Sequence, residues 1–443
     1  MLYPNPSNLR KSFIGDFKKF VHDRIYHPHQ IRFWRQQVYK IKNGGLLVLL
    51  QKCLFALRLA SAIPIVLLLR ALRPLVLVRF GVLISHHIGH FSSNTELYLC
   101  ERDAGLQPKR TIDIFHQSYR ISNQQLKTMW ERTLRVSPLV KWLYLANNLL
   151  PGGTAHVVPL LTDIDFQGAL PLARVHLFFT PEEEVLGQAG LRDLGLPEGA
   201  PFVCVYGRDT AYKGRLFPNQ DDRRNDYRNM SIQNFVPAAE ELARRGYFVI
   251  RMGAEVNEAL RTTNPMIIDY ATKARDDFLD IFLCAKCRFF MGGTGGLNSV
   301  PRLFHRPVVI ENLVPFLTDQ PLRLPPKCLI LPKKLWLLED QRFMTFREFL
   351  ETGPDFLELG PIKFPGFIHF ERIGVEVVEN TPEEIIAVAM EMDERLNGTW
   401  QITDEDRELQ QRFWSILEVT GPNEDFRPRM GAEFLRQNRE LLD

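Results

Sequence analysis

The chain has 443 residues, of which 45% are hydrophobic, 24% charged and 11% aromatic. This globular composition excludes a wholly disordered, collagen-like or coiled-coil chain, and the length suggests two core-bearing units with additions. The net charge of +3 is unevenly distributed: residues 1–80 hold fourteen Lys/Arg against two Asp, which gives +12, and the remainder is −9. A basic arm therefore precedes a mildly acidic body.

Residues 1–74 are predicted to form a basic, apolar helical arm that associates with a membrane. The longest charge-free run in its apolar stretch, Leu59–Leu69, is 11 residues long, whereas a spanning helix needs about 20. Pro64 is expected to kink a helix there. Cations interleaved with leucines suit a segment lying on an anionic membrane surface. The alternatives are a helix pair packed on the body, with its arginines directed outward, and a true span.

Other features of the sequence exclude some partners and compartments. So many leucines between the basic residues argue against a nucleic-acid-binding arm. The start of the chain lacks the pattern of a signal peptide. The six cysteines are scattered, mostly within apolar runs, which indicates a reducing compartment rather than a disulfide scaffold. Cys284-x-x-Cys287 is one isolated pair, and we expect it to pack in the core.

The first structured unit is predicted over residues 75–190. Leu75–Ile84 is apolar and β-branched, as in a strand buried on both faces, and a polar loop and a helical segment follow it. Ile112–Phe115 is a second short strand, and Leu126–Leu150 has helical spacing. This alternation predicts an α/β unit with a parallel sheet.

The second unit is predicted over residues 191–395, after a helix that begins with the capping box Thr180–Glu183. An identical box at Thr381–Glu384 starts a late helix, and residues 396–443 are expected to form a helical tail. The regular alternation of strands and helices indicates a doubly wound domain. Its predicted strands are Phe202–Tyr206, Tyr247–Arg251, Ile267–Asp269, Arg288–Met291 and Val308–Glu311, and its helices are Asn234–Arg245, Phe278–Ala285 and Leu297–Phe304.

A glycine loop, MGGTGGLNS, joins a buried strand to a helix in this second unit. Its glycines would permit positive φ and close approach of a ligand, and the helix would direct free N–H groups at the loop. Thr294 and Ser299 add hydroxyl donors. Such a loop suits a phosphate or diphosphate, although a tight strand–helix packing turn is the alternative. The candidate donor-binding residues here are Gly293, Thr294, Gly295, Gly296 and Ser299.

A second motif, GRDTAYKGRLFPNQDDRRNDYRN, follows the first strand of the same domain. Arg208 lies at the carboxyl end of that strand, where ligands of parallel sheets bind, and a guanidinium can hold a phosphate through two hydrogen bonds. Most charges of this loop are expected to pair with one another in solvent. Arg208, Tyr212 and Arg228 are the candidate donor-binding residues. Because both motifs follow strands of one parallel sheet, they are predicted to converge on one diphosphate.

Candidate acid–base and ribose-binding groups are less specific. His90 follows the first strand of the first unit, and histidine titrates close to neutral pH, which suits deprotonation of a hydroxyl. Asp209 and Glu96 compete for that role, and His90 can equally be a structural histidine. Asp269 and Glu311, each at a strand end, are candidates for hydrogen bonds to a ribose or base, or for helix capping. No metal site is expected.

The segments RDTAY, DYRN, IQNFVPAAEELARRGYFVIRMG, DFLDIFLCAKCRFFMGGTGGL and FHRPVV resemble a bacterial family of glycosyltransferases placed with the two-Rossmann, GT-B-like enzymes of surface-polysaccharide assembly. The resemblance extends over roughly residues 75–390, including HIGHFSSNTELYLCERDAG, and is most specific over 203–312. More distantly, Arg208 is similar to the diphosphate arginine of O-fucosyltransferases, and the GTGGL loop is similar to the phosphate loop of heptosyltransferases.

This resemblance implies an α/β fold of two Rossmann-like domains facing a cleft, an acceptor domain over 75–190 and a nucleotide-sugar domain over 191–395. It implies sugar transfer from a nucleotide-diphosphate sugar to a glycan or lipid-linked hydroxyl, with no metal or other cofactor. His90 or Asp209 would be catalytic. We expect the protein in the cytoplasm, bound through residues 1–80 to the inner-membrane surface. The alternatives are a nucleotide-sugar epimerase or hydrolase of the same fold, and a non-catalytic membrane-attached assembly factor.

Overall fold

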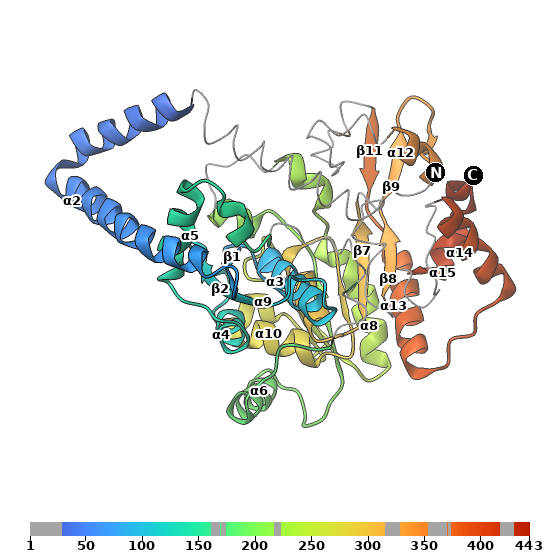
Figure 1. Ribbon diagram of the computed structural model, residues 1–443. Coiled ribbons are helices and arrows are strands. Elements are labelled where there is room, and N and C mark those ends of the chain that lie inside the picture. Colours follow the sequence, from blue (N-terminus) through green and yellow to red (C-terminus); the bar gives the residue numbers. More distant parts are fainter. Residues whose placement is uncertain are drawn as a thin grey trace.

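The structure is a computed structural model that describes residues 29–160, 169, 174–216, 223–314, 328–352, 370, 374–416 and 429–443. It has an α/β body built on mostly parallel sheets, from which one long helix extends (Figure 1). The α/β class predicted from the sequence is therefore confirmed.

A seven-stranded sheet forms the centre of the body, and every neighbouring pair of its strands is parallel. In spatial order the strands are β12 (Arg429–Met430), β8 (Leu329–Pro332), β7 (Val308–Leu313), β6 (Phe290–Gly292), β3 (Phe202–Tyr206), β4 (Phe248–Arg251) and β5 (Ile267–Ile268). The chain enters at β3, adds β4 and β5 on one side, and then crosses to β6 on the other. The winding therefore reverses between β3 and β6, as in a doubly wound sheet.

Helices cover this sheet in two groups. α8 (Val236–Arg244) and α13 (Pro382–Asn397) contact each other and strands of the sheet. α10 (Asp277–Lys286) and α11 (Ser299–Leu303) contact each other and also the N-terminal unit. α10 contacts α4 (Gln124–Thr133) of that unit, and α11 contacts α3 (Ile88–Asp103). A one-turn helix, α9 (Tyr270–Lys273), follows β5. The second group therefore lies between the large sheet and the N-terminal unit.

The N-terminal unit contains the two strands predicted from the sequence, paired in parallel. β1 (Leu77–Leu83) and β2 (Thr111–Gln117) pair in parallel and form a two-stranded sheet, connected by α3 (Ile88–Asp103). A buried ion pair strengthens this pairing, because Arg79 of β1 contacts Asp113 of β2 at 2.6 Å. Single parallel bridges at Val136 and Val157 extend it among the described residues.

Three further helices belong to this part of the chain. The predicted helical stretch Leu126–Leu150 is divided into α4 (Gln124–Thr133) and α5 (Val140–Leu149), and Pro138 lies between them. α6 (Pro181–Asp193) begins with the predicted capping box: Thr180 Oγ1 accepts from the Glu183 amide at 3.2 Å, and the Glu183 carboxylate accepts from the Thr180 amide at 2.9 Å. Capping residues were therefore reliable signals of a helix start.

The helix α2 (His29–Ala71) is 43 residues long and extends away from the body (Figure 1). Its last turns pack on α5 around Ala62 and Val66, and the Arg70 guanidinium donates to the Asn147 side chain at 2.8 Å. The alternative of a helix pair packed on the body does not fit the described residues, because α2 is a single helix and most of its residues from 46 to 71 are exposed. By length and composition alone, Val48–Ala71 is long and apolar enough to cross a membrane, with 11% of the tested window buried.

The sequence did not predict an antiparallel sheet of three strands, β9 (Lys334–Leu337), β10 (Arg342–Phe343) and β11 (Val375–Val378), in the order β10-β9-β11. Two short helices, α7 (Ala211–Leu216) and α12 (Phe346–Thr352), also lie in the second unit. The tail contains α14 (Asp404–Ile416) and α15 (Ala432–Gln437), as expected, but it also supplies β12 to the large sheet. It is therefore part of the sheet's core as well as a helical addition.

Candidate functional site

Two loops leave the large sheet from neighbouring strands at the point where its winding reverses. β3 ends at Tyr206 and β6 ends at Gly292, and these two residues are partners in the parallel register. The loop after β3 carries Arg208, and the loop after β6 is the glycine loop. Doubly wound sheets bind their ligands at this reversal point. The two motifs singled out in the sequence therefore start side by side.

A side chain from the first loop binds the second loop directly. Arg228, the last residue of the 3₁₀ helix Arg223–Arg228, donates from Nη2 to the Thr294 carbonyl at 2.9 Å. Its Nε also lies 3.4 Å from the Thr294 hydroxyl oxygen. This contact brings together two candidate donor-binding residues that are 66 positions apart in the sequence.

Arg208 is only 7% exposed, and its guanidinium is held beneath the loop that follows it. Nη1 donates to the Asn225 carbonyl at 3.1 Å and also to the Asn229 side-chain oxygen. The backbone of the loop returns to the strand end, because the Met230 amide donates to the Arg208 carbonyl at 3.0 Å. Arg208 is thus positioned by its own loop at the carboxyl end of β3.

Lys333, which the sequence analysis missed, adds a second buried cation. It follows β8 directly, is 4% exposed and donates from Nζ to the Asn229 carbonyl at 2.6 Å. Burial lowers the pKa of Lys333 to about 8; Glu379 opposes this shift and the charge of Arg208 adds to it. If the apolar run LILP had been predicted as a strand, Lys333 would have been placed at its carboxyl end. Ligands of parallel sheets bind at such ends, and ionisable groups with shifted pKa values are common at binding sites.

The glycines of the loop are required by space rather than by backbone conformation. None of Gly292–Gly296 has a positive φ, so the conformational freedom expected of them is not used. A Cβ on Gly295 would lie 2.5 Å from a ring carbon of Tyr206, and one on Gly293 would overlap the Met230 side chain. A side chain at position 295 would therefore collide with the Tyr206 ring, whereas at position 293 the neighbour is the end of the flexible Met230 side chain.

The helix after the glycine loop is shorter than predicted. A 3₁₀ turn, Gly296–Asn298, leads into α11, which ends at Leu303. So short a helix has a small macrodipole, because the dipole sums over aligned peptide groups. Ser299 is half-buried at its first position. Local backbone N–H groups and hydroxyls, rather than a long helix dipole, are therefore what this loop offers to an anion.

The start of α3 lies directly against the glycine loop. A Cβ on Gly89 would lie 2.9 Å from Gly296 Cα, and α3 also contacts α11. His90, the next residue, is half-buried, and its Nδ1 lies 3.2 Å from the Asn94 side-chain oxygen. The N-terminal unit therefore brings its candidate base to the segment that carries the candidate phosphate loop.

The neighbouring histidines form a small aromatic group. The rings of His86 and His87 lie 4.5 Å apart, and those of His87 and His90 lie 6.1 Å apart. Burial, together with the charge of His90, lowers the pKa of His86.

Asp209 and Tyr212 lie on the outer part of the first loop. Both carboxylate oxygens of Asp209 accept backbone hydrogen bonds, from the Ala211 amide at 2.9 Å and from the Asn257 amide at 2.8 Å. These bonds stabilise the loop and use one acceptor position on each carboxylate oxygen. Burial raises the pKa of Tyr212, and its charged neighbours include Arg120 of the N-terminal unit.

Asp269 and Glu311 are both buried in this structure. The Asp269 carboxylate accepts from Arg251 Nη1 at 3.1 Å and from the Leu260 amide at 2.9 Å, so its side chain does not cap the helix that follows it. Glu311 is fully buried beside a β-bulge in β7, and burial raises its pKa well above the usual range, offset in part by the amides of Glu311 and Gly292. A role for either in ribose binding stays a prediction.

The cysteine motif packs in the core, as predicted. Cys284 and Cys287 are buried and form no disulfide, and burial raises the pKa of the Cys284 thiol. Arg215 of the first loop pairs with Glu255, which lies after β4 and outside that loop, so this pair is not one of those expected within the loop.

Comparison with known proteins gives only distant structural similarities. No family model and no curated protein matches the chain. Escherichia coli ADP-heptose lipopolysaccharide heptosyltransferase II is similar over 57% of this chain and 90% of its own, at 13% identity and a TM-score of 0.34. A glycosyl transferase family 9 protein from Veillonella parvula is similar over 68% of this chain and 95% of its own, at 13% identity and a TM-score of 0.36.

A third similar structure is TibC, an iron-containing dodecameric glycosyltransferase from enterotoxigenic E. coli. It is similar over 53% of this chain and 59% of its own, at 15% identity and a TM-score of 0.27. The assignment to the α/β class rests on the chain's own sheet. That no metal is needed stays a prediction.

Proposed function

We propose that the chain is a glycosyltransferase that moves a sugar from a nucleotide-diphosphate sugar to a hydroxyl group. The observation that supports this most strongly is the contact between Arg228 and Thr294, which joins the loops after β3 and β6 at the reversal point of the sheet. A cationic loop and a glycine loop at that position suit a diphosphate.

The chain's own cations would stabilise the leaving group. As the bond between the anomeric carbon and the diphosphate oxygen breaks, negative charge grows on that oxygen. Arg208 and Lys333, both buried near Asn229, would stabilise this charge, which preorganised donors do most effectively away from water. Backbone N–H groups of the glycine loop and the hydroxyls of Thr294 and Ser299 would bind the phosphate oxygens.

His90 would activate the acceptor. Its imidazole would take the proton from the acceptor hydroxyl while that oxygen attacks the anomeric carbon. The position of His90 one residue from the Gly89–Gly296 contact supports this choice, and the two backbone hydrogen bonds of Asp209 argue against the competing base.

The acceptor would be a glycan or lipid-linked hydroxyl used in cell-surface polysaccharide synthesis, reached from the cytoplasmic face of the inner membrane. The exposed apolar residues of α2 and the basic charge of residues 1–80 support attachment to an anionic membrane surface.

The test is donor turnover by an Arg208→Ala variant. We expect loss of donor hydrolysis and transfer by about 10²–10³-fold or more, because one preorganised donor to the developing anion is removed. Circular dichroism checks the fold, and Arg208→Lys provides a variant that keeps the charge. Arg261→Ala is the matched control, since its side chain is 81% exposed. Wild-type turnover by Arg208→Ala contradicts the proposal.

A thermal-shift series with UDP, GDP, ADP and CMP identifies the donor base, since a ligand stabilises the folded state that binds it. Release of nucleotide and an altered sugar without any acceptor would instead identify an epimerase or hydrolase. Failure to bind any nucleotide would indicate a non-catalytic assembly factor.

A further inference from the structure

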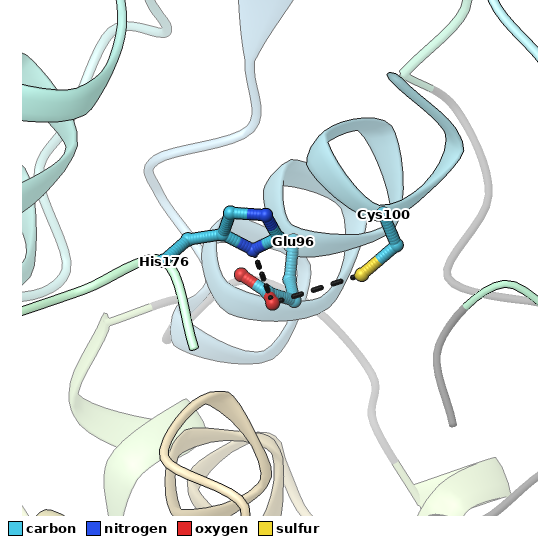
Figure 2. Close-up of side chains that lie close together, drawn as sticks. All are labelled: Glu96, Cys100 and His176. Atoms are coloured by element: carbon cyan, nitrogen blue, oxygen red, sulfur yellow. Dashed lines mark hydrogen bonds and ion pairs between the residues drawn. The ribbon is translucent and has the colours of Figure 1, made fainter. Parts of the chain in front are cut away.

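Three buried side chains from α3 and from the segment before α6 converge on one point (Figure 2). Glu96 and Cys100 lie one turn apart on the same face of α3, and His176 approaches them from the other segment. His176 Nδ1 lies 2.8 Å from Glu96 Oε1, and the Cys100 thiol lies 3.7 Å from the same oxygen. One ligand atom from each residue lies within 4.8 Å of the others.

One oxygen of this cluster has no partner. Glu96 is 2% exposed, and its Oε2 has no hydrogen-bond partner among the residues that the structure describes. A buried carboxylate oxygen without a partner is costly, because the water that would solvate it has been removed. A cation bound to this carboxylate would offset part of that cost.

The surroundings of His176 are those of a metal-binding histidine. Its second ring nitrogen, Nε2, lies 3.1 Å from Asp103 Oδ2, and Asp103 also accepts from Arg174 Nε at 2.9 Å. Histidines that bind a metal through one nitrogen usually donate the other N–H to a carboxylate, which fixes the tautomer and the orientation of the ring.

We propose that Glu96, Cys100 and His176 bind a divalent transition metal of the zinc class, with Asp103 as a positioning residue for His176. Thiolate, imidazole and carboxylate together suit Zn²⁺, and a water would complete a tetrahedral site. Tetrahedral bonds of about 2.0–2.3 Å place ligand atoms roughly 3.3–3.8 Å apart. The Glu96–Cys100 separation already fits, and the Glu96–His176 hydrogen bond must open by about half an ångström.

The metal would connect α3 to the segment that leads into α6. Glu96 lies six residues after His90, which is about 9 Å along a helix. The site would therefore fix the position of α3, whose first turn contacts the glycine loop, without touching the reacting groups. This inference does not depend on the proposed transferase activity.

The experiment is a titration of the metal-free full-length chain with Co²⁺, followed by competition with Zn²⁺. We expect one equivalent to bind, with a thiolate-to-cobalt charge-transfer band that Zn²⁺ removes. Cys100→Ser should abolish the band and weaken binding at least 100-fold, and Asp103→Asn should weaken it about 10–100-fold. Cys53→Ser, which changes an exposed thiol on α2, is the matched control and should bind as the wild type does.

Two results would overturn the proposal. One is the absence of a saturable cobalt–thiolate band in the wild-type chain, which does not depend on whether any variant folds. The other is a band of full intensity in a folded Cys100→Ser variant, which would place the cobalt on a different thiol.

Discussion

Lys333 and Arg208 are two buried cations that share Asn229 as a hydrogen-bond partner. Burial, and to a lesser degree the charge of Arg208, disfavours the charged form of Lys333 and lowers its pKa, whereas Glu379 opposes this shift. A diphosphate bound between them would offset both effects. The pair therefore suits a site that is occupied by an anion during its working cycle.

The affinity for a nucleoside diphosphate should consequently fall as the pH rises from 7 to 9. Lys333 loses its proton above a pKa of about 8, and loss of one charge contact worth about 1.4 kcal/mol corresponds to tenfold weaker binding. Titration calorimetry across this range measures the slope. The Lys333→Met variant should bind more weakly at pH 7 and show a shallower slope; an unchanged slope contradicts the assignment.

The same shift has a consequence for stability. Because the folded-state pKa of Lys333 lies below its unfolded value, the unfolded chain binds more protons between about pH 8 and 10.5. This group therefore makes the wild type more stable as the pH rises through that window. The free energy of unfolding, measured by urea denaturation, should rise relative to that of Lys333→Met over the same range.

At the scale of single elements, α3 and the glycine loop approach each other closely. Gly89 and Gly296 meet backbone to backbone, where no flexible side chain can move aside. Both the start of α3 and the loop must therefore shift if either residue gains a Cβ.

Gly89→Ala should destabilise the chain by about 1–3 kcal/mol, the usual cost of overpacking, and should reduce turnover by displacing His90. Urea denaturation and donor turnover measure the two effects. Gly214→Ala in α7 is the matched control, because a Cβ there has no neighbour within 4 Å, and it should be at least as stable as the wild type, since alanine favours a helix more than glycine does. Equal stability of the two variants would show that the contact is not tight in solution.

The capping box of α13 gives a second element-scale prediction. Thr381 Oγ1 accepts from the Glu384 amide at 3.3 Å, and the Glu384 carboxylate accepts from the Thr381 amide at 3.0 Å. Thr381→Ala should lower the free energy of unfolding by about 1 kcal/mol, because it leaves a helix N–H without its acceptor. Thr381→Ser keeps the hydroxyl and should lose much less. Thermal unfolding that does not distinguish the two variants contradicts this role.

Sequence patterns predicted the elements that carry a strong local signal. Phe202–Tyr206 was predicted at its observed bounds because a strand buried on both faces is apolar throughout. Strands β8 to β12 were missed, since each has two to four residues and is specified by its neighbours rather than by its own composition.

The candidate site was predictable only in part, for a related reason. The rule that doubly wound sheets bind ligands where their winding reverses was enough to predict that the loops after β3 and β6 lie together. Lys333 was not predicted, because it follows β8, a strand that was missed. Glu96 and His176 are 80 positions apart, and no local pattern connects them.

At the scale of the whole molecule, α2 is only partly covered by the body. Leu57 and Leu68 are 66% and 63% exposed, whereas Ala62 and Val66 on the same helix are buried against the body. The helix therefore has one face that packs on the body and another that carries exposed leucines. Such a face, together with the charge of +12 over residues 1–80, suits an anionic bilayer surface.

The double variant Leu57→Glu/Leu68→Glu should lose most binding to vesicles that contain anionic phospholipid, since it adds two negative charges, which the lipid headgroups repel, to the contact face. Vesicle co-sedimentation measures this. Leu186→Glu on α6 is the matched control: it is 56% exposed but distant in sequence from the arm, and binding should be unaffected. Retention of binding by the double variant would exclude the face as the contact.

The strand β12 affects how the sheet is completed during synthesis. β8 ends at Pro332 and pairs with β7, which has already been synthesised, but its second parallel neighbour, β12, is not complete until Met430, about 100 residues later. At roughly 5–20 residues per second, the ribosome needs roughly 5–20 s to cover that distance. Throughout that interval the nascent chain presents an open β8 edge, which is the kind of surface that chaperones bind and that aggregates recruit. Slow translation of the last hundred codons should therefore lower the yield of soluble protein more than slow translation of the first hundred.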